Sequence, residues 1–155
     1  MIQRVQTLYL LFAGLVIAGL FVFPLVHGVY VNGQPETITV TGVFKDVNGQ
    51  PAHTETFIPL IIATVFVALL PLSVIFFYKN RRRQINLCYG LMLVIIAYSY
   101  WVSQTVKNAI DGAYLNMSNY GIGIILLSLS LLLIVIAQKS IQKDEKLVRS
   151  ADRLR

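Results

Sequence analysis

Two histidines and one cysteine are the residues in this sequence best suited to metal, haem or thiol chemistry. His27 and His53 fall in one polar loop, and two imidazoles could together ligate a metal ion or a haem. No third ligand follows at a supporting spacing, so we interpret both as ordinary turn or strand residues and expect no cofactor. Cys88 is the single cysteine and has no disulfide partner, which predicts an inert thiol.

Aromatic and small residues of the apolar segments could instead line a pocket for a quinone or a lipid. The candidates are Pro71, which should kink its helix, and Tyr89, Tyr98 and Ser99 further along the chain. Tyrosine rings also gather at membrane interfaces without binding a ligand, and such an aromatic belt explains the same residues. Both interpretations of these rings stay open.

The elements that must hold these residues are strongly apolar. The chain has 155 residues, of which 56% are hydrophobic and 13% are charged, and its mean hydropathy is +0.69. Because average soluble domains carry about 25% charged residues, the composition predicts a small integral membrane protein. We expect four transmembrane helices at about 7–26, 57–78, 85–103 and 120–137, each close to the length that crosses about 30 Å of hydrocarbon.

None of these four segments contains Asp, Glu, Lys, Arg or His. Charged groups inside a membrane usually mark proton relays or ion pathways, so their absence argues against an ion-coupled transporter or a haem-binding bundle. The chain also has no nucleophile motif, phosphate loop or acid pair at catalytic spacing, and we predict that it is not an enzyme.

Basic residues predict which ends of the helices share one side of the membrane. Eleven of the thirteen Lys and Arg residues lie in the N-terminus, in the loop that contains Arg81, Arg82 and Arg83, and in the tail after residue 137. Cytoplasmic segments carry such an excess, so both termini should be cytoplasmic. The net charge of +6 then indicates contact with anionic lipid headgroups and requires no nucleic acid.

The first outer loop, about 27–56, has the pattern of a small antiparallel sheet. The pentapeptide Val-Asn-Gly-Gln-Pro occurs at Val31–Pro35 and again at Val47–Pro51, and Asn-Gly is a strong hairpin-turn signal. Between the copies, Ile38, Val40 and Phe44 fall on one face of an alternating segment, with Gly42 at a bend. We predict a three-stranded meander over about 27–31, 37–46 and 52–56.

The tail, 138–155, contains no Pro or Gly, so the fourth helix can continue into it. Its apolar residues gather on one side and its basic residues on the other, although Asp144 interrupts the apolar stripe. Such a helix could lie on the membrane surface, dock on a protein, or extend into solvent. The residues expected to contact a partner or lipid headgroups are Arg81, Arg82, Arg83, Lys143, Lys146, Arg149 and Arg153.

The two ends of the chain carry a family resemblance. The opening Met1-Ile-Gln-Arg-Val-Gln-Thr-Leu-Tyr-Leu-Leu11 and the ending Lys143-Asp-Glu-Lys-Leu-Val-Arg-Ser-Ala-Asp-Arg-Leu-Arg155 resemble an uncharacterised family of four-helix inner-membrane proteins from Bacteroidota-type bacteria, grouped as a domain of unknown function. The resemblance implies a bacterial cytoplasmic membrane, and it supplies no catalytic residues.

These observations lead to one overall prediction. The fold should be an all-α membrane domain over 1–155, a four-transmembrane-helix bundle with a β-meander in its first extracytoplasmic loop and a cytoplasmic C-terminal helical extension. The function should be that of a non-enzymatic adaptor or accessory subunit, which uses its basic loop and tail to contact anionic lipid or an unidentified membrane or cytoplasmic protein. The alternative is a small-molecule or lipid carrier subunit with a pocket near the aromatic residues of the third helix.

Overall fold

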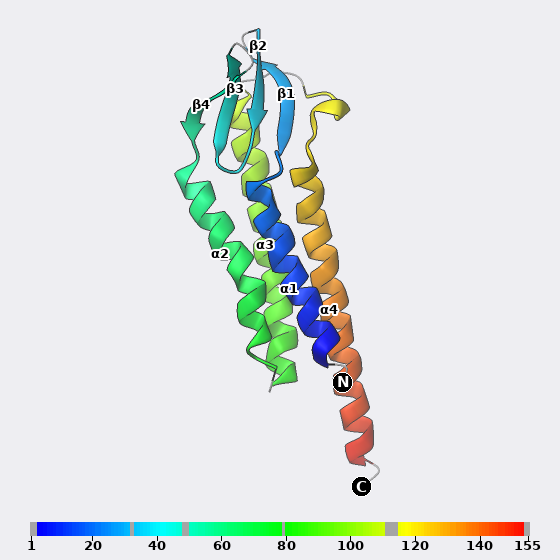
Figure 1. Cartoon of the computed structure of the whole chain (residues 1–155). Coiled ribbons are helices and arrows are strands. Elements are labelled where there is room, and N and C mark those ends of the chain that lie inside the picture. The colour runs from blue at the N-terminus through cyan, green and yellow to red at the C-terminus, as the bar shows by residue number, and fades with distance from the viewer. Residues whose placement is uncertain (1–2, 32, 48–49, 79, 111–114, 154–155) are drawn as a thin grey trace.

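The computed structural model describes residues 3–31, 33–47, 50–78, 80–110 and 115–153. Four long helices run side by side, and a small antiparallel sheet covers one end of them (Figure 1). The helices and helical turns are α1 (Gln3–Ala18), η1 (Gly19–Phe21), α2 (Ile58–Ile75), α3 (Arg81–Ala109), η2 (Met117–Asn119) and α4 (Ile122–Arg153). The strands are β1 (Val26–Val31), β2 (Gln34–Ile38), β3 (Gly42–Val47) and β4 (Gln50–Thr56).

Helix α1 packs along both α2 and α4, and α3 closes the bundle against the same two helices. Leu10, Ala13 and Ile17 are fully buried on α1 because they face its two neighbours. At Gly14 an added Cβ would lie 3.0 Å from the carbonyl oxygen of Ala68, so the missing side chain lets α1 and α2 approach closely.

Three helices are long and apolar enough to cross a membrane by length and composition: Ile58–Ile75, Arg81–Ala109 and Ile122–Val148. Their outward faces are apolar, and Ile62, Leu93 and Ile125 are each at least 65% exposed. Soluble proteins rarely expose so continuous an apolar surface, whereas lipid tails can cover it. Their length and composition therefore make these three helices candidate membrane spans.

The prediction of an all-α bundle with four transmembrane helices is wrong. The described residues include a four-stranded sheet, and the first apolar helix, Val5–Phe21, falls short of the length of a span. Val22–Val26 raised the hydropathy of the predicted span 7–26, but they are not helical. Leu25 and Val26, the first residue of β1, are instead fully buried, and the Leu25 N–H donates to the carbonyl of Ile38 at 2.9 Å.

The sheet is a meander in the order β1-β2-β3-β4, with every neighbouring pair antiparallel. The predicted middle strand, 37–46, divides into β2 and β3 at a tight turn. Thr39 makes this turn, because its hydroxyl accepts hydrogen bonds from the backbone N–H groups of Thr41 and Gly42. The reversal pairs Ile38 with Val43 rather than continuing one strand.

That turn also changes which side chains reach the core. Ile38 and Val40 are buried as predicted, but Val43 is 3% exposed while Phe44 is only half-buried against the ring of His53. Each of the two pentapeptides lies at a hairpin turn as predicted, since Val31 pairs with Gln34 and Val47 pairs with Gln50. Asn32, Asn48 and Gly49 lie outside the described residues.

Helices α3 and α4 extend beyond their predicted limits at the end of the bundle opposite the sheet. Arg81–Arg83 were expected in a loop, but they form the first turn of α3, whose Gln84 N–H donates to the Asn80 carbonyl at 3.0 Å. Helix α4 continues without interruption through the predicted tail to Arg153. Its 32 residues span about 48 Å, so its last turns pass the ends of the other helices (Figure 1).

Candidate functional site

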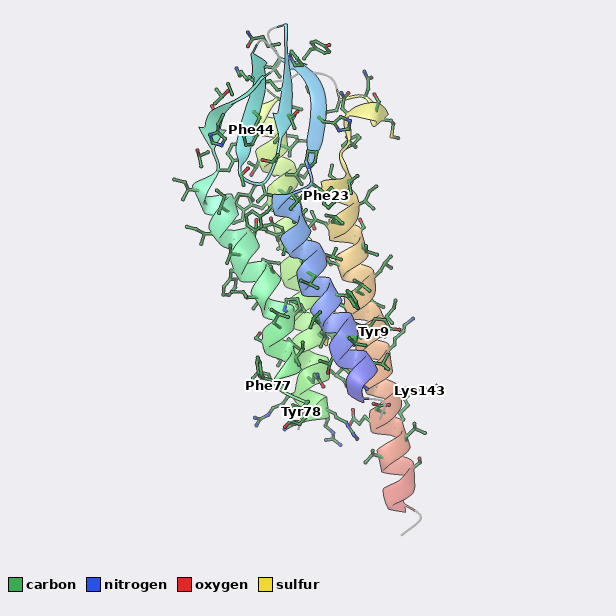
Figure 2. All side chains as sticks on the ribbon, viewed as in Figure 1. Tyr9, Phe23, Phe44, Phe77, Tyr78 and Lys143 are labelled. Carbon is green, nitrogen blue, oxygen red and sulfur yellow. The ribbon has the colours of Figure 1, made fainter. Side chains whose placement is uncertain are left out.

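The basic residues expected to contact a partner lie at the end of the bundle opposite the sheet. Figure 2 shows Lys143 on α4 near this end, where Phe77 and Tyr78 follow the end of α2. Arg82, Arg83, Lys143 and Lys146 are exposed there, and Arg81 is half-buried. Arg149 and Arg153 lie on the same helix as Lys143, but their side chains fall outside the described residues.

An ion pair joins two of the predicted basic elements. Arg82 on α3 donates from Nε to Oε1 of Glu145 on α4 at 3.2 Å. Arg82 is 74% exposed, so solvent screens the pair and its contribution to folding stability is about 0–1 kcal/mol. Its main effect is to position the first turn of α3 beside the start of the tail.

A second polar contact holds α1 against α4. The amide Nε2 of Gln6 donates to Oδ2 of Asp144, although 138 positions separate them in the chain. Both side chains are at least nine-tenths buried, and Oδ1 of Asp144 has no hydrogen-bond partner in the described part of the chain. Asp144 thus interrupts the apolar stripe because it faces α1 and not solvent.

We expect Gln6→Leu to lower stability clearly. It would remove the one hydrogen bond that the buried Asp144 carboxyl accepts from the described residues, at a cost of about 1–3 kcal/mol. The melting temperature in detergent should fall by about 5 °C. The measurement is thermal unfolding followed with a thiol-reactive dye, for which the fully buried Cys88 is the reporter.

The matched variant is Gln6→Leu combined with Asp144→Leu. It removes donor and acceptor together, which is nearly neutral when apolar groups replace both. The double variant should therefore melt above Gln6→Leu alone. A double variant that melts at or below the single one would show that the buried hydrogen bond is not the cause.

The start of the projecting tail combines apolar and basic side chains. Leu147 is 52% exposed and Val148 is 44% exposed, and the exposed Lys146 precedes them directly. Ile141, from the same predicted stripe, is fully buried in the bundle. The stripe is therefore divided, so that its first part anchors α4 and the part after Glu145 remains accessible.

A pocket of about 410 Å³ lies between α3 and α4 in the half of the bundle nearer the sheet. Its apolar walls are Ile96, Val102 and Val106 from α3 and Ile124, Leu127 and Leu131 from α4. Three serines, Ser99, Ser103 and Ser128, also line it. Lys107 and Tyr120 lie at the end of the pocket toward the sheet.

The structure separates the four residues predicted to share a pocket. Ser99 lines the pocket described above, and Pro71 is buried inside α2. Tyr98 is 4% exposed, and its hydroxyl lies 2.6 Å from the hydroxyl of Thr64. Because Thr64 donates its own proton to the carbonyl of Leu60, Tyr98 is the donor in this link between α3 and α2.

Tyr89 lies apart from the other three, near the basic end of the bundle. It is 51% exposed, and its hydroxyl accepts a hydrogen bond of 3.4 Å from Gln142 on α4. Sequence reasoning missed the partners on α4, Gln142, Glu145 and Ser128, because only the packing of α4 on α3 brings them near. The interruption at Asp144 was a usable signal that this turn of α4 faces another helix.

The histidines do not form part of a ligand cluster. His27 and His53 are both exposed, and Nδ1 of His53 lies 3.5 Å from the hydroxyl of Thr56. Among the described residues, no three His, Cys, Asp or Glu side chains gather closely enough to hold a metal ion.

Comparison with known proteins places the chain in a family but adds no activity. No curated protein and no solved structure matches it. A family model described as a domain of unknown function (DUF4293) matches residues 2–154, which is nearly the whole chain. The expectation that the chain belongs to a family grouped as a domain of unknown function is thereby confirmed. The chain belongs to the DUF4293 family.

Proposed function

We propose that the protein is a non-enzymatic membrane adaptor that presents the last turns of α4 to a protein partner. The observation that carries the proposal is the continuous helix α4, which leaves the bundle after Glu145 with Leu147 and Val148 exposed beside basic side chains. An amphipathic helix of this kind suits a partner with an apolar groove and an acidic rim.

The direction of the tail favours a protein over the membrane surface. The segment Ile122–Val148 contains one candidate span, whose uncharged part ends before Lys139, and the tail continues along the same helix (Figure 1). A helix that continues the axis of a span points away from the bilayer, whereas a surface-bound helix must lie in its plane. The contacts of Asp144 with α1 and of Glu145 with Arg82 support that direction up to the point where the tail begins.

The orientation in this proposal follows from charge. The end that bears Arg81–Arg83 and the tail would face the cytoplasm of a bacterial cell, in keeping with the excess of basic residues there. The resemblance to Bacteroidota-type inner-membrane proteins is in line with this location. Arg83 and its neighbours would bind anionic headgroups and leave the tail free for the partner.

The test is site-specific photocrosslinking in the native membrane. A photoreactive amino acid at Leu147 should form one discrete protein adduct, because this side chain is exposed at the start of the tail. Changing both Lys143→Glu and Lys146→Glu should reduce the adduct about tenfold or more, since each basic residue at a charged surface is worth about 1 kcal/mol.

Two controls make the result specific. The same photoreactive amino acid at Leu93, which is 68% exposed on the apolar face of α3, should give no such adduct. Thr54→Glu, in the sheet, adds negative charge at the other end of the bundle and should leave the Leu147 adduct unchanged. An adduct that survives the double charge reversal at full yield would overturn the proposal, as would its absence from Leu147.

A further inference from the structure

The pocket between α3 and α4 has polar groups at one end and an apolar interior. From Ile96 to Lys107, α3 rises about 16 Å, and from Tyr120 to Leu131 the opposite wall covers the same number of residues. Half the hydrocarbon thickness of a bilayer is about 15 Å. With Lys107 at the membrane surface on the sheet side, a pocket of this length would reach about the middle of the bilayer.

Small side chains on both walls leave this space open. Ser99 donates its hydroxyl proton to the carbonyl of Ile95 at 2.8 Å, so it adds little polarity to the pocket. Ser103 and Ser128 are exposed, as is Ile96, and the pocket is therefore accessible from the outer surface of the helices. In a bilayer, a hydrocarbon chain would fill such a space, because an empty one forfeits dispersion contacts.

The groups at the sheet end suit a phosphate. Lys107 is exposed on the last turn of α3, where a flexible ammonium can reach the level of lipid headgroups. Tyr120 also lines this end of the pocket, and its phenol can act as a hydrogen-bond donor. One cation and one hydroxyl above an apolar chamber as deep as one leaflet match an amphiphile with a single phosphate and a long chain.

We propose that the α3–α4 pocket binds one acyl chain of a glycerophospholipid from the leaflet on the sheet side, with the lipid phosphate at Lys107. This site lies at the opposite end of the bundle from the tail and does not depend on the adaptor function. It differs from general lipid contact in that one chain enters between two helices, rather than lying against their outer faces.

The test uses the full chain reconstituted in vesicles of phosphatidylglycerol and phosphatidylethanolamine. A small fraction of the phosphatidylglycerol carries a photoactivatable group in the middle of one acyl chain, and mass spectrometry maps the labelled residues. Labelling should concentrate on the pocket segments 96–106 and 124–131. Ser99→Leu combined with Ser128→Leu fills the pocket and should reduce that labelling about tenfold, because the chain has nowhere to enter.

The contribution of the Lys107 charge is tested by a separate substitution. Lys107 is exposed, so its replacement should not affect folding. Lys107→Glu should reduce pocket labelling by phosphatidylglycerol about tenfold, because it replaces attraction with repulsion at the headgroup. A diacylglycerol probe with the same photoactivatable chain but no phosphate should label wild type and Lys107→Glu equally. The matched controls are Ser73→Leu on an exposed position of α2 and Thr54→Glu in β4, at the same end of the bundle as the mouth of the pocket.

Three results would overturn the inference. The first is labelling spread evenly over the exposed apolar faces, including Leu93 and Ile62. The second is pocket labelling that the two serine substitutions leave unchanged in a protein that still elutes as a folded species. The third is equal phosphatidylglycerol labelling in wild type and Lys107→Glu.

Discussion

Gly121→Ala should lower the melting temperature of the detergent-solubilised protein by about 10 °C. A Cβ at this position would lie 2.2 Å from the carbonyl oxygen of Pro24 and 3.1 Å from that of Leu25. Both obstacles are backbone atoms, so no side chain can rotate to make room. The same backbone carries hydrogen bonds from Gly121 to Leu25 and from Gly123 to Pro24, which would be strained together.

Gly90→Ala is the matched control for this variant. Gly90 lies inside α3 with nothing within 4 Å of an added Cβ, and alanine stabilises a helix interior by about 0.5–1 kcal/mol relative to glycine. Its melting temperature should stay the same or rise slightly in the Cys88 dye assay. Equal behaviour of the two variants would contradict the close contact between the start of α4 and the segment that follows η1.

Lys146→Pro should abolish the photoadduct at Leu147 while leaving the bundle folded. Proline at this position removes a helical hydrogen bond where α4 passes its last contacts with α3, and the turns beyond are too short to hold a helix alone. The melting temperature should change by no more than about 2 °C, because the last turns of α4 project past the other helices (Figure 1). The measurements are adduct yield and thermal unfolding on the same preparations.

Lys146→Ala separates the shape of the tail from its charge. Alanine keeps the helix and removes one cation, so the adduct should fall no more than about fivefold. Loss of the adduct in Lys146→Pro but not in Lys146→Ala would show that the partner recognises the tail in its helical conformation. An adduct of full yield in Lys146→Pro would mean that the partner contacts a different part of the chain.

The hydropathy of the sequence identified the apolar helices, but it could not distinguish apolar residues buried within the protein from those that face lipid. Leu25 and Val26 are as apolar as a lipid-facing pair, yet they are buried where β1 begins, against the residues that precede α4. Leu25 makes hydrogen bonds with Ile38 and Gly121, and Val26 pairs with Tyr120, so most of these partners are distant in sequence. This is why the first predicted span was too long.

In the sheet too, features set by adjacent residues could be predicted, whereas features set by residues distant in sequence could not. Both Asn-Gly turns were predictable, because hairpin turns depend on two or three adjacent residues. The turn at Thr39–Gly42 was not predicted, although Gly42 was recognised as a bend. An added Cβ at Gly42 would lie 1.8 Å from the carbonyl oxygen of Glu55 on β4, so the position of another strand decides its role.

For the candidate sites, single residues were easier to predict than groups. The sequence alone predicted that Arg82 and Lys143 lie at the same end of the helices. That prediction uses only the distribution of Lys and Arg among the loops and requires no knowledge of contacts. The links from Gln6 to Asp144 and from Tyr98 to Thr64 depend on which helices are neighbours. The pocket at Ser99 depends on small residues facing each other across α3 and α4, which no single segment reveals.

Three spanning helices would carry the sheet and the tail to opposite faces of a membrane. In a Cys88→Ala background, Thr54→Cys in β4 and Ser150→Cys in α4 place one exposed thiol at each end. Right-side-out vesicles of the bacterial cytoplasmic membrane are treated with a membrane-impermeant maleimide before and after permeabilisation. Thr54→Cys should react at once and Ser150→Cys only after permeabilisation. Reaction of both thiols from the same side would show that the sheet and the tail do not lie on opposite faces of the membrane.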